Sequence, residues 1–154
     1  MTDAPRIAQP LRIVWGALCA GAALAVAGAG WLAVQAEASP LAERAEGAFY
    51  VVALLGVAGL AAAFFLVHRM EERLVRATSE AEAERTVALY GVAALAAAEV
   101  PALAAATAAV LTGDLLVLAF GAPLFAFAAL TWPGDDRVAR WLGPAQRASG
   151  AALR

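Results

Sequence analysis

Four long apolar segments constrain the fold of this chain more than any other feature. They cover about residues 13–34, 47–67, 86–111 and 115–132. An α-helix needs about 20 consecutive apolar residues to cross the hydrocarbon core of a bilayer. The sequence therefore predicts an all-α transmembrane four-helix bundle, with residues 1–154 forming a single membrane domain. Composition agrees, because 63% of the residues are hydrophobic and the mean hydropathy is +0.74.

Residues 1–38 also fit a second interpretation, a cleaved secretory signal. The triplets VQA and AEA at its end resemble the small-residue pattern of a cleavage site. The apolar stretch has about 22 residues, whereas the apolar region of a signal usually has about 7–15. Its length favours a retained span, and both interpretations remain open at this point.

The arginines predict which side of the membrane each connection faces. Arg44 alone lies between the first two spans, and the chain has no lysine. The other ten arginines lie in the N-terminal tail, in the second connection or in the C-terminal tail: Arg6, Arg12, Arg69, Arg73, Arg76, Arg85, Arg137, Arg140, Arg147 and Arg154. The positive-inside rule makes that side cytoplasmic. We expect a multi-pass protein of a bacterial cell (inner) membrane, N-in and C-in, with Trp15 and Trp31 as the interfacial aromatic residues of span one.

The second connection, residues 68–85, has the pattern of a cytoplasmic helical hairpin. Arg69, Arg73 and Arg76 form a stripe at helical spacing. Ser79 followed by Glu82 is typical of a capping box at a helix start. Span two is therefore expected to continue to about residue 77, and span three to begin near residue 80.

Shorter signals mark other helix ends. Ser39 and Pro40 predict an N-cap and a first helical residue for span two. Gly113 fits a left-handed C-cap of span three, and Asp114 fits an N-cap of span four. The connection between these spans is so short that they must be antiparallel neighbours.

The tail, residues 133–154, allows two interpretations. Apolar residues lie beside arginines in it, namely Val138, Trp141 and Leu142. One interpretation is a short helix lying on the inner membrane surface. The other is a solvated, disordered tail.

Residues typical of catalysis are nearly absent. The single histidine, His68, lies at the inner end of span two and is expected to be interfacial, and the single cysteine, Cys19, has no intrachain partner. The sequence contains no Cys/His metal spacing and no glycine-rich phosphate loop. The net charge of −2 gives no basic footprint for nucleic acid. We therefore expect no enzymatic activity, cofactor, metal or nucleic-acid partner, and a lipid-modifying enzyme lacks a visible catalytic set.

Glu99 is the most informative residue, because it lies near the middle of span three. An ionised carboxylate there costs about 2.5–3.5 kcal/mol on insertion scales, so we expect a neutral acid that donates and accepts hydrogen bonds. Pro101 lacks an N–H group, which leaves the carbonyl of Ala97 without its helical donor. Two interpretations remain open: a structural hydrogen bond to a carbonyl or to the Thr107 region, or a site for a proton, cation or polar ligand.

Two resemblances are seen. The runs ALAAAEVPAL around Glu99 and GALCAGAALAVAGAG in span one resemble the helices of the rotary ATPase c subunit, which would make Glu99 an ion-carrying acid. In a four-span c-type chain the acid would lie in the second or fourth span, whereas here it lies in the third. As a whole the chain resembles small uncharacterised four-span bacterial integral membrane proteins, which often have an acid and a proline in the third span. That resemblance implies only the architecture.

The sequence thus predicts a small non-enzymatic membrane protein, an accessory or scaffold subunit of a membrane assembly. The alternative is a proton- or cation-handling component that uses the candidate polar site, Glu99, Pro101 and Thr107. The expected partners are the lipid bilayer and other membrane subunits or further copies of the chain.

Overall fold

The structure, a computed structural model, describes residues 7–35, 39 and 41–152, with side chains as far as residue 143. Within these residues the chain is helical and contains no strand, so the predicted all-α class is confirmed. In chain order the elements are α1 (Ala8–Gln35), η1 (Ala42–Arg44), α2 (Ala45–Arg76), α3 (Glu80–Thr112), η2 (Leu115–Gly121), α4 (Ala122–Thr131) and α5 (Asp135–Ala152), where η denotes a 3₁₀ helix.

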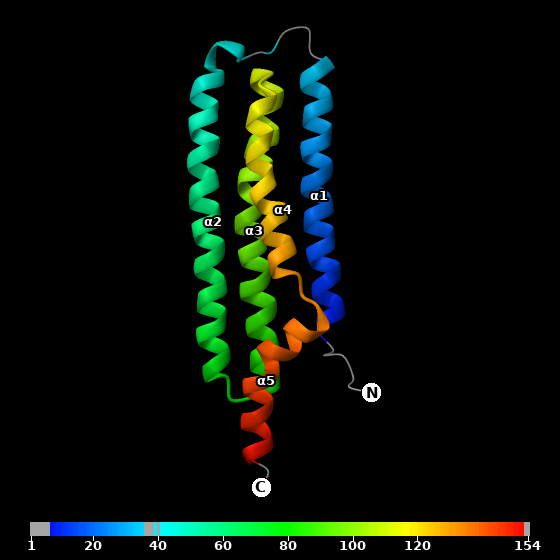
Figure 1. Cartoon of the computed structure of the whole chain (residues 1–154), viewed down its shortest axis with the longest axis vertical. Coiled ribbons are helices and arrows are strands. Elements are labelled where there is room, and N and C mark those ends of the chain that lie inside the picture. Colours follow the sequence, from blue (N-terminus) through cyan, green and yellow to red (C-terminus); the bar gives the residue numbers. More distant parts are fainter. Residues whose placement is uncertain (1–6, 36–38, 40, 153–154) are drawn as a thin grey trace.

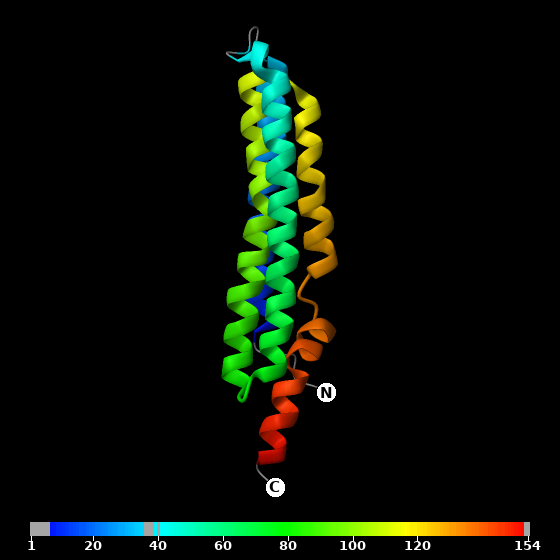
Figure 2. The same ribbon diagram turned by 90° about the vertical axis from the view of Figure 1, so that its left-hand side faces the viewer.

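The long helices run side by side (Figure 1). Seen from the side, α3 and α4 flank α2, with α1 behind (Figure 2). Three described helices, α1, η1–α2 and α3, are long and apolar enough to cross a membrane. The apolar segment Leu115–Thr131 joins residues 135–143 at a bend of 68°, and counting this bent pair as one span gives four.

The central element is α3. Half of its most apolar window is buried, against 11% for α1 and 17% for η1–α2. It contacts α1, α2, η2, α4 and α5. Its buried face consists largely of alanine, with Ala94, Ala98, Ala102, Ala105 and Ala109 each at most 1% exposed. Small side chains let helix backbones approach closely, which is how helices pack in a membrane where the surrounding lipid is equally apolar.

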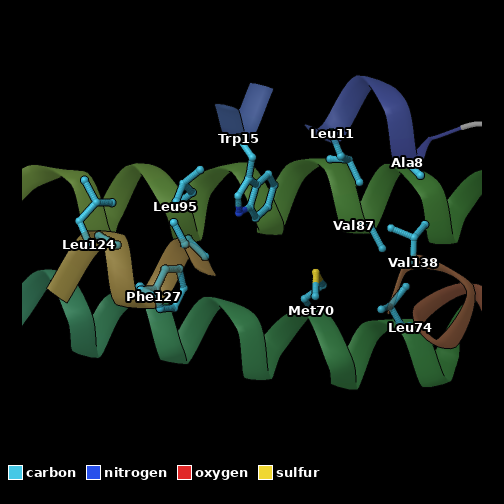
Figure 3. Packing of buried hydrophobic residues seen from close by; sticks show 14 of the residues in the cluster. Ala8, Leu11, Trp15, Met70, Leu74, Val87, Leu95, Leu124, Phe127 and Val138 are labelled. Carbon is cyan, nitrogen blue, oxygen red and sulfur yellow. The ribbon is translucent and has the colours of Figure 1, made fainter. Parts of the chain in front are cut away.

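Larger side chains fill the core at one end of the molecule, where α2 ends, α3 begins and α5 lies; we call this the arginine-rich end. Met70 and Leu74 of α2 lie opposite Val87 of α3, and Val138 of α5 lies beside Leu74 (Figure 3). Leu142 of α5 is also fully buried. The tail is therefore helical from Asp135 to Ala152, and its first turns pack on the other helices.

The predicted helical hairpin between the second and third apolar segments is confirmed. Helix α2 continues to Arg76, and α3 begins at Glu80. The Ser79 side chain caps α3, because its Oγ accepts a hydrogen bond from the Glu82 N–H at 3.2 Å. The Glu82 carboxylate bonds the residue before the cap, accepting from both the N–H and the hydroxyl of Thr78 at 3.1 Å.

At the opposite end, the turn between α3 and η2 is as predicted. Gly113 takes a left-handed conformation, with φ of 74°, and its N–H bonds the Ala109 carbonyl. Asp114 accepts a hydrogen bond from the Leu116 N–H at 2.9 Å. The last turn of α3 gains a further partner, since the N–H of Leu41 donates to the Leu111 carbonyl at 2.9 Å. Such bonds satisfy carbonyl groups that a helix end leaves open.

The predicted N-cap role of Ser39 at the start of α2 is wrong. The α-helix begins at Ala45 after the short 3₁₀ helix η1, and Pro40 lies outside the described residues. The Ser39 carbonyl accepts the N–H of Ala42, and its side chain packs against Gly113. The Ser39 side chain thus packs against the connection between α3 and η2 and does not cap a helix.

The fourth apolar segment is a composite of two helix types. Its first seven residues, η2, are wound as a 3₁₀ helix, and the next ten form α4. At about 2.0 Å and 1.5 Å per residue the two pieces add up to roughly 29 Å, close to the ~30 Å hydrocarbon core. Pro123 has no N–H group that could donate to the carbonyl of Ala119. Instead the Ala122 N–H bonds this carbonyl, because the 3₁₀ pattern ends just where the proline begins α4.

The beginning of α1 is tied to the connection between α4 and α5. The Arg12 guanidinium bonds the Pro133 carbonyl at 3.1 Å and the Asp135 carboxylate at 2.7 Å. The Trp15 side chain does not face outward as an interfacial aromatic residue would, because it is only 1% exposed and packs on Gly91 of α3. The absence of a side chain at Gly91 makes room for the indole ring. Trp31 is 67% exposed, as an interfacial residue would be.

Candidate functional site

Glu99 lies on the flank of α3 that faces α1. Its side chain is partly exposed, between the buried residues Ala98 and Ala102 and the exposed Val100 and Leu103. No hydrogen bond or ion pair joins its carboxyl group to any residue that the structure describes. The thiol of Cys19 on α1 lies within electrostatic range of it. The carboxyl group is therefore a polar group at mid-span without a partner among the described residues.

Pro101 lies on the other flank of α3, which packs on α2. The ring is fully buried, and it lies within 4 Å of the side-chain positions of Gly56 and Gly59 on α2. A side chain at Gly59 would meet the Ala97 carbonyl oxygen at 2.7 Å and the Pro101 ring at 3.0 Å. The carbonyl that loses its helical donor at the proline is thus covered by the backbone of α2. Glu99 and Pro101 are about 200° apart around the helix, at 3.6 residues per turn.

Thr107 lies apart from both Glu99 and Pro101. Its side chain is exposed, and its hydroxyl donates to the Leu103 carbonyl of the same helix at 3.0 Å. It lies eight residues from Glu99, or about 12 Å along the axis. The structure therefore does not bring the candidate residues Glu99, Pro101 and Thr107 together into one site.

Thr107 instead lines an apolar groove of about 680 Å³ between α2 and α3, near the end opposite the arginine-rich one. Its walls include Gly47, Ala48, Ala104 and Ala108, whose small side chains leave the space open. This groove was not predicted from the sequence. The sequence pattern that could indicate it is a pair of small residues four positions apart, such as Ala104 and Ala108. Such pairs are too frequent to be informative in a chain with 45 alanines and 13 glycines.

A second hollow, of about 610 Å³, lies between α2 and α3 at the arginine-rich end. The stripe of Arg69, Arg73 and Arg76 forms one of its walls. The sequence indicated the stripe but not the hollow, because the wall from α3, with Thr86 and Tyr90, comes from a distant part of the sequence.

The remaining polar groups do not form a reaction centre among the described residues. No three His, Cys, Asp or Glu side chains lie close enough together to hold a metal ion there. His68 is exposed, and its Nε2 lies 3.4 Å from the Glu72 carboxylate. The Trp15 indole N–H is buried and has no hydrogen-bond partner in the part of the chain that the structure describes.

Comparison with protein families, with curated proteins and with solved structures found no match for this chain.

Proposed function

We propose that this chain is a non-enzymatic, multi-pass protein of a bacterial inner membrane that serves as an accessory or scaffold subunit of a membrane assembly. In this proposal it has four spans, the fourth being the η2–α4 segment, and both ends of the chain face the cytoplasm. The arginine distribution supports this orientation. The described part of α5 lies at the same end as the α2–α3 connection, which is consistent with an even number of spans (Figure 1).

One observation carries the proposal: Glu99 is partly exposed at mid-span and has no partner in the described chain. A polar group in hydrocarbon is costly, and intramembrane acids usually face other protein or water. Its position beside α1 leaves it open to a polar group from another subunit or a second copy. Such interhelical hydrogen bonds contribute about 0.6 kcal/mol on average and up to about 1.7 kcal/mol.

A second candidate function is proton or cation handling by Glu99. The same exposure favours it, because a carboxyl group enclosed by its own chain could not exchange a proton with a neighbour. Cys19 is a second titratable group within electrostatic range. For this function the ionisable carboxyl group itself is necessary, and a side chain that only makes the same hydrogen bond cannot replace it.

The variants Glu99→Gln and Glu99→Leu separate the two candidates. For a scaffold, the Gln variant should keep the size of the assembly extracted in mild detergent, because an amide still donates and accepts, while the Leu variant should shift it to smaller species. For ion handling, the Gln variant should keep the assembly but abolish proton or cation flux in proteoliposomes. Thr107→Val, which removes an exposed hydroxyl elsewhere on α3, is the control. An unmodified chain that runs as a monomer in mild detergent would contradict the scaffold role.

A further inference from the structure

The hollow at the arginine-rich end has the lining of an anion site. Two helices form its walls, with Phe65, Arg69, Glu72, Arg73 and Arg76 from α2 and Glu82, Thr86 and Tyr90 from α3. Three of these eight side chains are cationic and two are anionic.

The two carboxylates are engaged by neighbouring groups. Glu72 is bound by Arg69 at 3.0 Å and lies 3.4 Å from His68. Glu82 accepts both the N–H and the hydroxyl of Thr78. Arg73 and Arg76 have no carboxylate within ion-pair distance in the described chain. Two positive charges in the hollow are therefore not neutralised by a bonded acid from the described residues.

Aromatic rings hold the first two arginines of the stripe in place. The Arg69 guanidinium lies 5.3 Å from the centre of the Phe65 ring, and that of Arg73 lies 5.5 Å from the Tyr90 ring. A cation over an aromatic face is stabilised by the ring quadrupole. The contact between Arg73 and Tyr90 also crosses from α2 to α3, so it places a guanidinium over the hollow instead of leaving it to extend into water.

The hollow extends from an exposed aromatic ring to the arginines of the stripe. Phe65 belongs to the apolar part of α2 and is 56% exposed. Arg73 and Arg76 follow it about two and three turns later and are about 4.5 Å apart along the axis. The polar layer on each side of the hydrocarbon core is about 5–8 Å thick. With Phe65 in the hydrocarbon, Arg73 and Arg76 therefore fit within one headgroup layer.

We propose that this hollow binds an anionic glycerophospholipid from the leaflet at the arginine-rich end. Its phosphate lies between the guanidinium groups of Arg73 and Arg76, and an acyl chain runs along Phe65. Arginine suits phosphate because its planar group offers several N–H donors in a fixed geometry. Basic hollows between spans are a recognised form of headgroup site. A membrane lipid, unlike free phosphate, also accounts for the exposed aromatic ring at the inner edge.

The test uses the full chain in neutral detergent, titrated with phosphatidylglycerol and, in parallel, with phosphatidylcholine and inorganic phosphate, with bound molecules counted by native mass spectrometry. We expect one phosphatidylglycerol to bind at least tenfold more tightly than phosphatidylcholine. At about 1 kcal/mol for each arginine, Arg73→Gln with Arg76→Gln should weaken its binding about 30-fold. The matched control, Arg85→Gln with Arg140→Gln, removes the same charge from exposed positions outside the hollow and should change binding less than threefold.

Three results would overturn the proposal. Equal binding of the two lipids would show that headgroup charge does not contribute to the affinity. Equal losses in the two double variants would indicate attraction to the overall charge of this end and not to a site. Inorganic phosphate that binds as tightly as phosphatidylglycerol would show that the lipid is not the ligand. Circular dichroism of each variant checks that the helices are intact, and Arg73→Lys with Arg76→Lys, which keeps the charge, should restore most of the binding.

Discussion

The α-carbon of Gly59 on α2 faces the backbone carbonyl of Ala97 on α3, so closely that a side-chain carbon at Gly59 would lie 2.7 Å from the oxygen. This carbonyl has no N–H donor in its own helix, because residue 101 is a proline. The Cα–H group of Gly59 points toward it, and such contacts are weak but favourable at helix–helix interfaces. The proline and the glycine are therefore two parts of one packing arrangement.

Gly59→Ala should accordingly loosen the contact between α2 and α3. The new methyl group meets backbone, which cannot turn away as a side chain can, and overpacking of this kind typically costs about 1–3 kcal/mol. Unfolding of the protein in mixed detergent micelles would measure the loss. Gly47→Ala on the same helix is the control, because nothing lies within 4 Å of a side chain there. It should leave stability unchanged or raise it slightly through helix propensity. Equal stability of the two variants would refute the close contact.

Ser79→Ala should weaken the start of α3 by about 1 kcal/mol, the usual effect of losing an N-cap hydrogen bond. Hydrogen exchange of the amides at residues 80–84 would show faster opening, above all at Glu82, whose N–H the Ser79 hydroxyl accepts. Ser79→Asn, which keeps a capping side chain, should exchange nearly as slowly as the unmodified protein. If the unmodified amides are already unprotected, no capped helix begins there.

The ion pair of Arg12 and Asp135 should contribute little but measurably to stability. Its side chains are 35% and 51% exposed, and pairs of this kind give about 0.2–1 kcal/mol. A double-mutant cycle with Arg12→Gln and Asp135→Asn should return a coupling in that range, and it should shrink as salt is added. The cycle of Arg140→Gln with Asp136→Asn, two exposed residues with no ion pair, should return none. A coupling that is zero at low salt would contradict the contact.

Topology can be tested with reporters. The arginine distribution leads us to expect a cytoplasmic signal from a reporter fused after Arg154 and an external signal from one inserted near Glu43. A third reporter in the short connection between α2 and α3, after Thr78, should match the first. An external C-terminus would overturn the proposed orientation and the count of four spans together.

Most of the helical framework could be predicted from the sequence, because each signal is local. The long apolar runs, the Ser79 cap, the Gly113 turn and the Asp114 cap depend on residues only a few positions apart. The start of α2 was wrong for the same reason: Ser39 has the residue type of a cap, but it packs against Gly113, which is 74 positions away.

The arrangement around Glu99 was harder to predict, because it depends on which flank of α3 meets which helix. Glu99 and Pro101 are close in sequence, yet one faces α1 and the other α2. Nothing in a run of alanines indicates this orientation. Trp15 shows the same limit, since its position near the end of an apolar run is typical of an interfacial residue, whereas Gly91 on another helix provides the space that buries it.

The 3₁₀ winding of η2 has a consequence for the whole fourth apolar segment. Wound as α-helix, the same seven residues would be about 3.5 Å shorter and would turn the chain by about 140° less. Such a rotation would carry Leu124 and Phe127 of α4, now almost fully buried, out of the core. The length of this segment and the face that it buries are therefore coupled. In the proposed four-span arrangement, a change of bilayer thickness would thus favour a rotation of this helix.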